Sequence, residues 1–600
     1  MKLSDVVAQF LKDQGIYHVF AISGGASLHL IHSIAATTGI DYVCPLHEQS
    51  GAFAADAYSR VTGNLGCAIA TSGPGATNLI TGIAGAYYDS VPVLFLTGQV
   101  ATFRSKKDTG VRQMGFQETE IVDMCSSITK YGVLIQDPYE VLFELGKAIH
   151  IAKTGRPGPV LVDIPDDIQR MDIDVSKLKK YTPLEEVKTS EKIKKEMSII
   201  DKTVKLIQKS KRPILIYGWG VHLAGAQYEA IELSHLLGIP IALTWAARDL
   251  LESVDPLAAG GFGTHGTRPA NFAVQNADLV ISIGSRLDTK ATGTPPTSFA
   301  REAKLVMVDI DVTEINKFKH LNVKIDVPAN LDALKFLRLL LGNLAQRDLA
   351  KDMPDFSEWV SRINQWKIQY PIYVKKDIKN SEVNPYWFME QFSSLLNNEE
   401  IIFADTGCAL AWMMQGFIFK KDQRFFHAFN STPMGYAVPG AIGAAFARPK
   451  QNIICITGDG SLQMNIQELA TIAHHKLPIK IILFNNHGHA MVRQTQDMWL
   501  DGNHYATSTA GGLPDPDFIG IAKAYGFRVE SIKSSDDCIS KIKSILQGSD
   551  PCLVNVEINP EFGVAPQVRF GRPNEDSEPL LEREEFLKNM IIQPLPISLT

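Results

Sequence analysis

Residues 453–486 read IICITGDGSLQMNIQELATIAHHKLPIKIILFNN, and this stretch decides the fold class. The apolar run Ile453–Thr457 predicts a buried strand, Gly458-Asp459-Gly460 a turn, and the residues from about Leu462 a helix. A second apolar run, Ile479–Phe484, predicts another strand. A strand, a crossover helix and a second strand are typical of a parallel sheet, so the stretch indicates an α/β fold.

Two oxygen-bearing side chains follow these two strands. Asp459 comes directly after the first strand, and Asn486 follows the second, 27 residues later. Because parallel strands end at the same edge of a sheet, we expect the two side chains to lie together. Carboxylate and amide oxygens suit Mg²⁺, and a helix start at Gly460-Ser461 offers backbone N–H groups to a phosphate. A GDG turn alone is a weak signal, whereas GDG, 24 further residues and Asn-Asn between two apolar strands is far more specific.

The same alternation of short apolar runs and longer helical patterns recurs along the chain. Further predicted strands lie at Cys67–Thr71, Val93–Thr97, Val160–Ile164, Ile214–Tyr217, Leu279–Ile283 and Leu305–Asp309. Two charged stretches, about Lys177–Glu196 and Ala345–Asn380, are polar enough for linkers or solvated helices. They divide the chain into predicted domains at 1–176, 197–344 and 380–560, followed by a tail at 561–600. We therefore predict an α/β protein of three doubly wound parallel-sheet domains.

Composition narrows the class of protein further. The 600 residues are 45% hydrophobic and 21% charged, which is ordinary for a globular chain. The 59 Lys and Arg against 65 Asp and Glu give a formal net charge of −6, which argues against a whole-protein binder of nucleic acid. No apolar run approaches the ~18 residues of a membrane span. The seven Cys include no CxxC pair and the N-terminus reads as an amphipathic helix, so we expect a cytoplasmic protein.

Four further motifs share a likeness to one enzyme family. They are HEQSGAFAADAYSR at 47–60, TSGPGATN at 71–78, GRPGPVLVDIP at 155–165 and MGYAVPGAIGA at 434–444. Together with the spacing of Asp459 and Asn486, they resemble the thiamine-diphosphate-dependent enzymes, most of all the large subunits of acetolactate synthases, over nearly the whole chain. The likeness implies a first domain that binds the thiamine pyrimidine, a central domain of FAD-binding type, and a third domain that binds the diphosphate and Mg²⁺.

The resemblance implies that Glu48 activates the cofactor. Thiamine must lose a proton from its thiazolium C2, and its own aminopyrimidine can be the base if a carboxyl group protonates the far ring nitrogen. Glu48 matches that carboxyl group, and the Ala- and Gly-rich helix that follows indicates close packing. A lone Glu at a helix start could instead only complement the helix dipole. In the family this Glu serves the cofactor of the next subunit, so a homodimer or homotetramer with shared active sites is implied.

Other positions match the family's contacts to thiamine diphosphate. Met434 matches a bulky residue between the two cofactor rings, although ordinary core filling would also explain a Met. The Thr432 carbonyl and the Met434 N–H match the groups that hold the pyrimidine edge. Cys408-Ala409 stands where the family commonly has Gln-His, which keeps backbone donors and loses side-chain contacts to phosphate. The matched cofactor contacts are Asn78, Thr406, Gly407, Cys408, Ala409, Thr432, Met434, Gly460, Ser461, Asn486 and Gly488, and the matched metal ligands are Asp459, Asn486 and Gly488.

The predicted central domain matches the family's FAD contacts. The matched positions are Arg156, Gly218, Gly220, Thr244, Gly263, His265, Gly284, Arg286, Asp309 and Asp326. In synthases of this type the flavin does no net redox work. The family's glycine triplet is Gly218-Trp219-Gly220 in this chain. A domain of this kind without flavin is the alternative, because a fold does not determine its ligand.

The positions that recognise the second substrate depart from the family. Phe116 and Gln117 are kept, whereas Lys290 stands in place of an Arg, Thr495 in place of a Trp and Asp166 in place of a Lys. Lys loses the bidentate recognition of a carboxylate, and Asp166 reverses a charge. These changes weaken a compact anionic acceptor and suit a larger or hydroxyl-rich one. The alternative is that they are tolerated variants, with Arg493 restoring the charge.

The resemblance thus implies a decarboxylating carbon–carbon ligase of acetolactate synthase type, with pyruvate as donor, a 2-oxoacid as acceptor and a place in branched-chain amino acid biosynthesis. One alternative keeps this chemistry and uses a keto-sugar acceptor, linked to a nucleotide. Another is a pyruvate oxidase in which FAD accepts electrons. A catalytically dead partner subunit is disfavoured, because the key acidic and amide residues are intact. The tail at Gly571–Ile592 is expected either to pack as a surface helix or to close as a lid over the cofactor.

Overall fold

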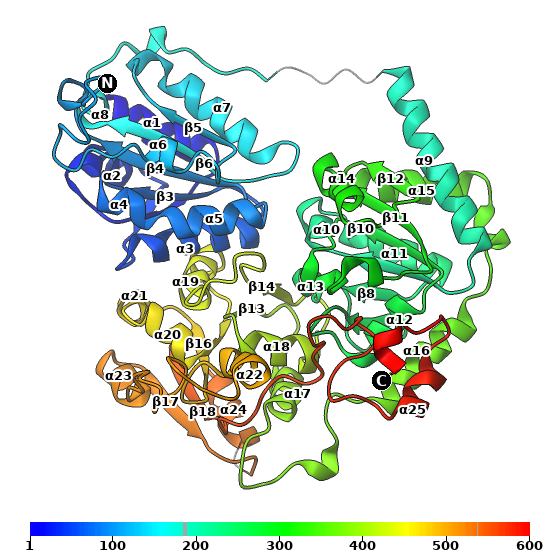
Figure 1. The fold of residues 1–600 in the computed structure, drawn as a ribbon. Coiled ribbons are helices and arrows are strands. Elements are labelled where there is room, and N and C mark those ends of the chain that lie inside the picture. Colours follow the sequence, from blue (N-terminus) through cyan, green and yellow to red (C-terminus); the bar gives the residue numbers. More distant parts are fainter. Residues whose placement is uncertain (184–188, 537, 600) are drawn as a thin grey trace.

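The computed structural model describes residues 1–183, 189–536 and 538–599, and it shows three lobes that each contain a six-stranded parallel sheet (Figure 1). This confirms the predicted class of three α/β domains. Part of the first charged stretch, residues 184–188, lies outside the described residues.

The first and third domains have the same strand order. In the first it is β2 (Asp41–Val43), β1 (His18–Ala21), β3 (Gly66–Ala70), β4 (Val93–Gln99), β6 (Val160–Pro165) and β5 (Tyr131–Leu134). In the third it is β14 (Arg424–Phe426), β13 (Ile401–Ala404), β15 (Ile453–Gly458), β16 (Ile479–Asn485), β18 (Cys552–Glu557) and β17 (Arg528–Ile532). The strands are short, apolar and mostly buried, as a sheet covered by helices on both faces requires.

The helices of these two domains connect the strands. Those of the first domain are α1 (Leu3–Asp13), α2 (Leu28–Ala36), α3 (Glu48–Thr62), α4 (Pro74–Asn78), α5 (Ile80–Tyr88), α6 (Ile121–Met124), α7 (Val141–Lys153) and α8 (Asp166–Gln169). Those of the third are α17 (Pro385–Leu395), α18 (Cys408–Gly416), α19 (Ala437–Ala447), α20 (Asp459–Met464), α21 (Glu468–His475), α22 (Ala490–Trp499), α23 (Phe518–Ala524) and α24 (Cys538–Leu546). The expected N-terminal amphipathic helix is α1. The helix expected near Leu462 begins at Asp459, so the GDG segment starts a helix rather than forming a separate turn.

The central domain has a different strand order. Its sheet runs β12 (Val327–Asn330), β11 (Lys304–Asp309), β10 (Leu279–Ile283), β7 (Pro213–Tyr217), β8 (Ile241–Leu243) and β9 (Ala258–Gly261). Counted from its first strand, this is the 3-2-1-4-5-6 order of dinucleotide-binding sheets, read from the opposite edge. Its helices are α9 (Ser190–Lys209), α10 (Trp219–Leu223), α11 (Gln227–Leu237), α12 (Arg268–Gln275), α13 (Thr289–Thr292), α14 (Val312–His320), α15 (Ala333–Gln346) and α16 (Ser357–Gln369).

The second charged stretch is more than a linker. Within it, α16 places Trp359, Ile363 and Trp366 on one face, and these side chains are buried in the core of the central domain. Residues four and three apart share a helix face, so the pattern is that of an amphipathic helix. The structural domain therefore extends past the predicted end at 344.

The first and third domains share a hydrophobic core. Helix α3 packs against α19, and a Cβ added to Gly443 would lie 2.1 Å from the Ala54 carbonyl oxygen. The small residues of both helices allow this approach, which confirms the close packing predicted for the helix that follows Glu48. The two domains therefore hold each other in a definite orientation within one chain (Figure 1).

The tail crosses from the third domain to the central one, where it appears in red (Figure 1). Its helix α25 (Arg583–Asn589) buries Phe586 in the central core, and Asn574 Nδ2 donates to the Ala291 carbonyl at 2.8 Å. The start of the tail packs on the third domain, where Trp412 Nε1 donates to the Gly563 carbonyl at 3.0 Å, and none of the described tail residues lines the main cavity. Of the two expectations for the tail, the packed surface helix is the one observed in this structure.

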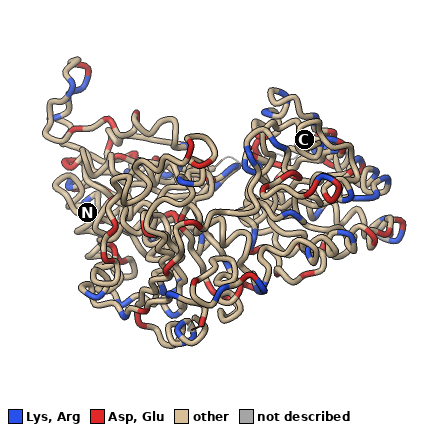
Figure 2. The backbone as a smooth tube through the Cα atoms, turned by 60° about the horizontal axis from the view of Figure 1, so that its bottom comes forward, with Lys and Arg blue, Asp and Glu red and all other residues tan. Residues whose placement is uncertain are grey.

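Charged residues of both signs are interspersed along the chain (Figure 2). This distribution agrees with the near balance of acids and bases in the sequence. Within the described residues, no helix combines the length and apolar character needed to cross a bilayer.

Candidate functional site

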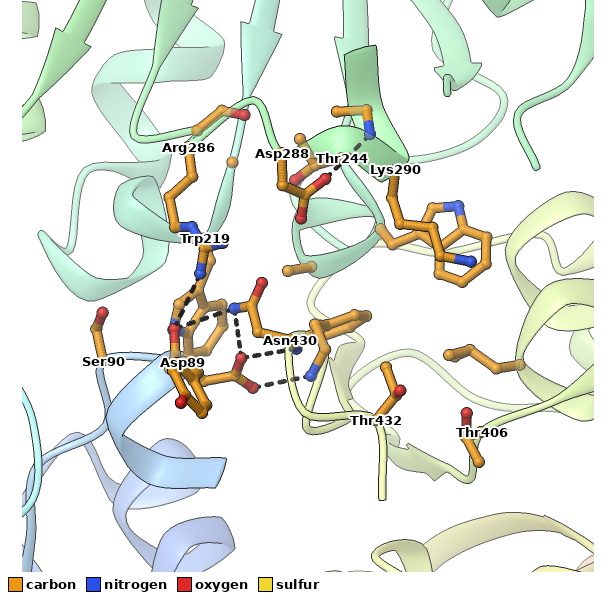
Figure 3. Close-up of a pocket in the computed structure, with 18 of the residues that line it drawn as sticks. Asp89, Ser90, Trp219, Thr244, Arg286, Asp288, Lys290, Thr406, Asn430 and Thr432 are labelled. Carbon is orange, nitrogen blue, oxygen red and sulfur yellow. Dashed lines mark hydrogen bonds between the residues drawn. The ribbon is translucent and has the colours of Figure 1, made fainter. Parts of the chain in front are cut away.

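A cavity of about 650 Å³ lies where the three domains meet. It is lined by residues of the turn after α5, of the loops after β7 and β10 in the central domain, and of the loops after β13, β15 and β16 in the third domain (Figure 3). In both the central and the third domain, the lining loops flank the point where the strand order reverses. Ligands of open α/β sheets bind at such points, so the topology itself marks this cavity as the candidate site.

The predicted diphosphate loops meet at one end of the cavity. The lining residues there include Thr406, Gly407, Cys408 and Ala409 before and in α18, and Gly460 and Ser461 in α20. Gly407 has a φ of 84°, a conformation that favours glycine and turns the chain into the helix. The backbone N–H groups of the first turn of α18 have no partner within the helix, so they are available to an anion.

The predicted metal ligands lie together beside these loops. Asp459 Oδ1 accepts from the N–H of Gly460 at 2.8 Å, and Oδ2 accepts from the N–H of Gly488 at 2.8 Å. Asn486 Oδ1 is buried and has no hydrogen-bond partner among the described residues. Burial raises the pKa of Asp459, against the opposing effect of these two N–H groups. A cation between the carboxylate and the amide oxygen would satisfy both groups.

The predicted pyrimidine loop lies next to the diphosphate loops. Thr432 and Met434 line the cavity, and the Met434 Cε atom is 3.0 Å from where a Cβ on Gly460 would lie. Thr432 has a φ of 44°, a strained value for a β-branched residue. His489, which the sequence did not suggest, lies 2.6 Å from the same Gly460 position through its Nε2. Gly460 is therefore enclosed by two side chains that leave no room for a Cβ.

Glu48 lies apart from this cavity. Asn78 Nδ2 donates to Glu48 Oε2 at 2.9 Å, and a Cβ on Gly75 would lie 3.4 Å from Glu48 Oε1. The Gln117 Cβ comes closer still to the same glycine turn, at 2.9 Å from a Cβ on Gly73. Glu48, Asn78 and Gln117 thus form one group, which we call the Glu48 group, and none of them lines the cavity of their own chain.

Phe116 lies beside the Glu48 group and is 85% exposed. The loop before it is held by Glu118, which accepts from the N–H groups of Lys106, Met114 and Gly115. These hydrogen bonds lower the pKa of Glu118.

The positions matched to FAD contacts mostly line the cavity. Those that do are Arg156, in the first domain, and, in the central domain, Gly218, Gly220, Thr244, His265, Gly284, Arg286 and Asp309. Gly218 and Gly220 are glycines because the loops after β7 and β10 touch: a Cβ on Gly220 would lie 2.7 Å from the Gly284 Cα. Gly263 and Asp326 do not line the cavity in the described structure. Asp326 instead accepts from the Leu305 N–H at 3.1 Å, on the side of the sheet away from the cavity-lining loops.

Several of these lining residues have a shifted pKa or already form ion pairs within the protein. Burial lowers the pKa of His265 to about 3, and its Nε2 has no partner among the described residues. Burial also raises the pKa of Asp309 to about 6. Arg156 is paired with Asp311 at 3.0 Å and with Glu314 at 2.8 Å. A phosphate at Arg156 would therefore have to compete with two carboxylates.

Of the three predicted acceptor positions, only Lys290 lines the cavity. The Thr495 hydroxyl donates to the Met491 carbonyl at 3.2 Å, within its own helix. Asp166 begins α8 in the first domain, on a different lobe from the cavity's third-domain wall. The structure therefore does not bring the three positions together within one chain.

The sequence reasoning assigned no role to several lining residues, among them Asp89, Trp219 and His489. Asp89 and Trp219 lie at the junction of the three domains (Figure 3), where the Arg60 guanidinium is 5.5 Å from the Trp219 ring centre. No spacing rule indicates Asp89, because its bonds with Phe429 and Asn430 join residues at least 340 positions apart.

Comparisons with known proteins agree with this geometry. Family models described as the N-terminal TPP binding domain, the central domain and the C-terminal TPP binding domain of thiamine pyrophosphate enzymes match residues 1–124, 200–340 and 405–556. A probable acetolactate synthase large subunit of Methanocaldococcus jannaschii is 35% identical over 93% of this chain and 92% of its own length. An acetolactate synthase large subunit of Cyanidium caldarium is 34% identical over 96% of both chains. A chloroplastic acetolactate synthase of Nicotiana tabacum is 34% identical over 95% of this chain and 84% of its own.

Proposed function

The chain belongs to the thiamine pyrophosphate enzyme family, and we propose that it is a thiamine-diphosphate-dependent carboligase that joins the acetyl unit of pyruvate to a 2-oxoacid. The observation that carries the proposal is the single cavity into which the Thr406–Ala409 loop, Asp459 and Met434 all open. Near full-length similarity to acetolactate synthase large subunits supports the same reaction. It does not favour the pyruvate oxidase alternative.

The residues present fit Mg²⁺ and a diphosphate. The orphaned Asn486 Oδ1 and the buried Asp459 carboxylate supply two oxygen ligands, and phosphate oxygens would complete the coordination of a hard cation. No cluster of three or more His, Cys, Asp and Glu side chains suited to a metal occurs in the described residues. A mixed protein and phosphate ligand set is therefore the reasonable one. When bound, thiamine diphosphate supplies a carbon nucleophile that attacks a 2-oxoacid and accommodates the electron pair left by CO₂.

The protein's own groups divide the remaining work. Glu48 holds a proton toward the pyrimidine nitrogen, which favours the tautomer that can act as a base. Met434, which lies beside Gly460 in the cavity, would support the bound cofactor between its two rings, as the family match implies. Lys290 is placed to neutralise a carboxylate in the cavity, although without the bidentate grip of an Arg.

We propose a homodimer or homotetramer in which Glu48 serves the cofactor of a partner subunit. The Glu48 group does not line the cavity of its own chain, so a site with both Glu48 and Asp459 requires a second copy. A twofold axis would bring each Glu48 group to the opposite cavity and complete two equal sites. The exposed ring of Phe116 would then be covered.

We also propose FAD as the ligand of the central domain. The support is the dinucleotide-type strand order and the lining by Gly218, Gly284 and Asp309 at its reversal point. Asp309 is placed where such domains contact a ribose hydroxyl group. Purification with stoichiometric flavin, read from the absorption spectrum, is the expected result. Protein that stays colourless and shows no change when FAD is added would support the flavin-free alternative.

A keto-sugar acceptor remains the second candidate, and one observation favours it. Lys290, which lines the cavity, stands where the family has an Arg, so the cavity lacks the bidentate recognition of a carboxylate at this position. Labelled pyruvate with thiamine diphosphate, Mg²⁺ and FAD, and no second substrate, is the experiment that tests the proposal. Rapid formation of acetolactate would establish the 2-oxoacid acceptor. Slow CO₂ release with little acetolactate would point to another acceptor, and no CO₂ release at all would refute the proposed donor chemistry.

A further inference from the structure

The first domain reaches the cavity of its own chain through the turn that ends α5. Asp89 in this turn is 3% exposed, and its carboxylate has four donors. Oδ2 accepts from the Phe429 N–H at 2.9 Å and from Arg60 Nη2 at 2.8 Å. Oδ1 accepts from the N–H of Asn430 at 3.0 Å and from its side-chain amide at 2.6 Å. Figure 3 shows Asp89 facing Asn430 across the junction.

The local helix does not explain an acid at this place. Asp89 is the C-cap of α5, and the C-terminal end of a helix carries a partial negative charge. A carboxylate there is unfavourable for the helix, and its burial adds a desolvation cost. Donors from other parts of the chain compensate for this cost, namely Arg60 and, in the loop after β14, Phe429 and Asn430. The position of Asp89 is therefore best explained by what it holds.

What Asp89 holds is one end of the predicted pyrimidine loop. The other end is held by a second buried carboxylate, Asp405, which accepts from the N–H of Gly435 at 2.9 Å and of Tyr436 at 3.2 Å. Residues 431–434 are suspended between these two carboxylates, and they contain Thr432 and Met434. Thr432 keeps its positive φ only if its surroundings enforce it.

We propose that Asp89 is a positioning residue that sets the carbonyl of Thr432 and the N–H of Met434 for the thiamine pyrimidine. The role of Asp89 depends on the proposed function in one respect, namely that this loop binds the pyrimidine of the cofactor. Without Asp89 the loop would keep both bonds at the Asp405 end, whereas the Asn430 end would keep only the bond from Asn430 Nδ2 to the Tyr88 carbonyl at 3.1 Å. The diphosphate loops after β13 and β15 would be unaffected, because the donors to the Asp89 carboxylate are Arg60, Phe429 and Asn430, which lie outside those loops. Loss of Asp89 should thus weaken the pyrimidine end of the cofactor selectively.

Two probes separate the two ends of the cofactor. The dissociation constants of thiamine diphosphate, and of inorganic diphosphate competing with it, are measured with Mg²⁺ for the full chain. For Asp89→Asn we expect the dissociation constant of thiamine diphosphate to rise about tenfold, because the charge-assisted hydrogen bonds that hold the loop are lost. The dissociation constant of inorganic diphosphate should stay within about twofold of that of the unmodified protein. The rate of CO₂ release at saturating cofactor should also fall, since the ring remains misplaced.

The matched control is Asp163→Asn. Asp163 is a buried carboxylate of the same domain, bonded to Thr97 at 2.7 Å and to Gln99 at 2.9 Å, and it does not contact the loop. It should leave both dissociation constants unchanged. Equal weakening of both probes by Asp89→Asn, or no weakening of either, would overturn the proposal.

A milder variant covers the case in which Asp89→Asn does not fold. Asn430→Ala removes the 2.6 Å side-chain bond to Asp89 and the 3.1 Å bond to the Tyr88 carbonyl, and it should weaken thiamine diphosphate about threefold with no effect on inorganic diphosphate. An unchanged ratio of the two constants would contradict the proposal. If the unmodified protein binds thiamine diphosphate but ligates no pyruvate, the proposed function fails, and the ratio still decides the role of Asp89.

Discussion

The backbone N–H of Gly488 donates to the carboxylate of Asp459 at 2.8 Å, although the two residues are 29 positions apart. Asp459 starts α20 after β15, and Gly488 follows the neighbouring strand β16. Gly488 has a φ of 146°, and a Cβ on it would lie 2.3 Å from the Thr507 carbonyl oxygen. The bond therefore closes a corner that only glycine can complete, and the unpartnered oxygen of Asn486 lies in that corner.

Asp459→Ala should remove a metal ligand and the bond to Gly488. We expect the affinity for thiamine diphosphate in the presence of Mg²⁺ to fall about 10–100-fold, because the metal joins the diphosphate to the protein. Calorimetric titration with and without Mg²⁺ measures this loss. Glu561→Ala, at an exposed position at the start of the tail, is the control. An unchanged Mg²⁺ dependence would remove Asp459 from the metal site.

Glu48→Gln should leave the fold intact and lower activity about 10²–10⁴-fold, because an amide cannot give the pyrimidine nitrogen a proton. The hydrogen bond from Asn78 can persist through the amide oxygen, so the thermal unfolding midpoint should hardly change. The initial rate of CO₂ release from pyruvate is the measurement, with Asp13→Asn at an exposed site as the control. Near-normal turnover would refute the role of Glu48.

A mixture of Glu48→Gln and Asp459→Ala chains should recover activity that neither variant has alone. If each site takes Glu48 from one subunit and Asp459 from the other, a mixed dimer keeps one intact site of two. Random reassociation at equal concentrations makes half of the dimers mixed, so we expect about a quarter of the normal activity. The assay is carboligation after joint unfolding and refolding. Activity no greater than the sum of the separate variants would place Glu48 and Asp459 in the site of one chain.

Lys290→Arg combined with Thr495→Trp should favour a 2-oxoacid acceptor. The guanidinium can bind a carboxylate with two hydrogen bonds, and the Trp ring supplies a wall that Thr495 lacks. We expect the KM for 2-oxobutyrate as acceptor to fall about tenfold, which product analysis at varied acceptor concentration would measure. The single variants separate the two effects. If neither changes the KM, these two departures have no part in acceptor choice.

Acid should destabilise the protein through His427. Burial lowers the pKa of this His to about 4, and Nδ1 lies 2.8 Å from the Ala404 carbonyl, so the folded state holds a neutral ring. The unfolded chain takes up the proton near pH 6.5. The neutral His427 ring therefore makes its full contribution to the free energy of unfolding above about pH 6.5. This free energy falls by up to about 3 kcal/mol as the pH falls to about 4. Urea unfolding midpoints at pH 5 and pH 7 measure this, and His427→Gln should reduce the difference between them.

The predicted strands and site loops were recovered well because their signals are local. Apolar runs such as Ile453–Thr457 can be buried only inside a covered parallel sheet, and the residues just after them must then lie along one edge. The spacing of Asp459 and Asn486 in the sequence is therefore enough to predict that both lie at the same corner of the sheet. In contrast, the charged composition of Ala345–Asn380 predicts a linker or a solvated helix and does not indicate that Trp359 and Trp366 are buried, because three apolar positions make only a short helical pattern.

What the sequence determined by itself is the set of parallel-sheet domains, the glycine turns that end their strands, and the pairing of an acid with an amide at one sheet edge. These follow from periodicity and from the geometry of neighbouring parallel strands. Only the tertiary structure decided that Glu48 faces away from the cavity of its own chain, and that Asp89 holds the loop at Asn430. Both depend on how whole domains pack, through contacts 340 or more residues apart in the case of Asp89, and such contacts leave no periodic pattern in a single chain.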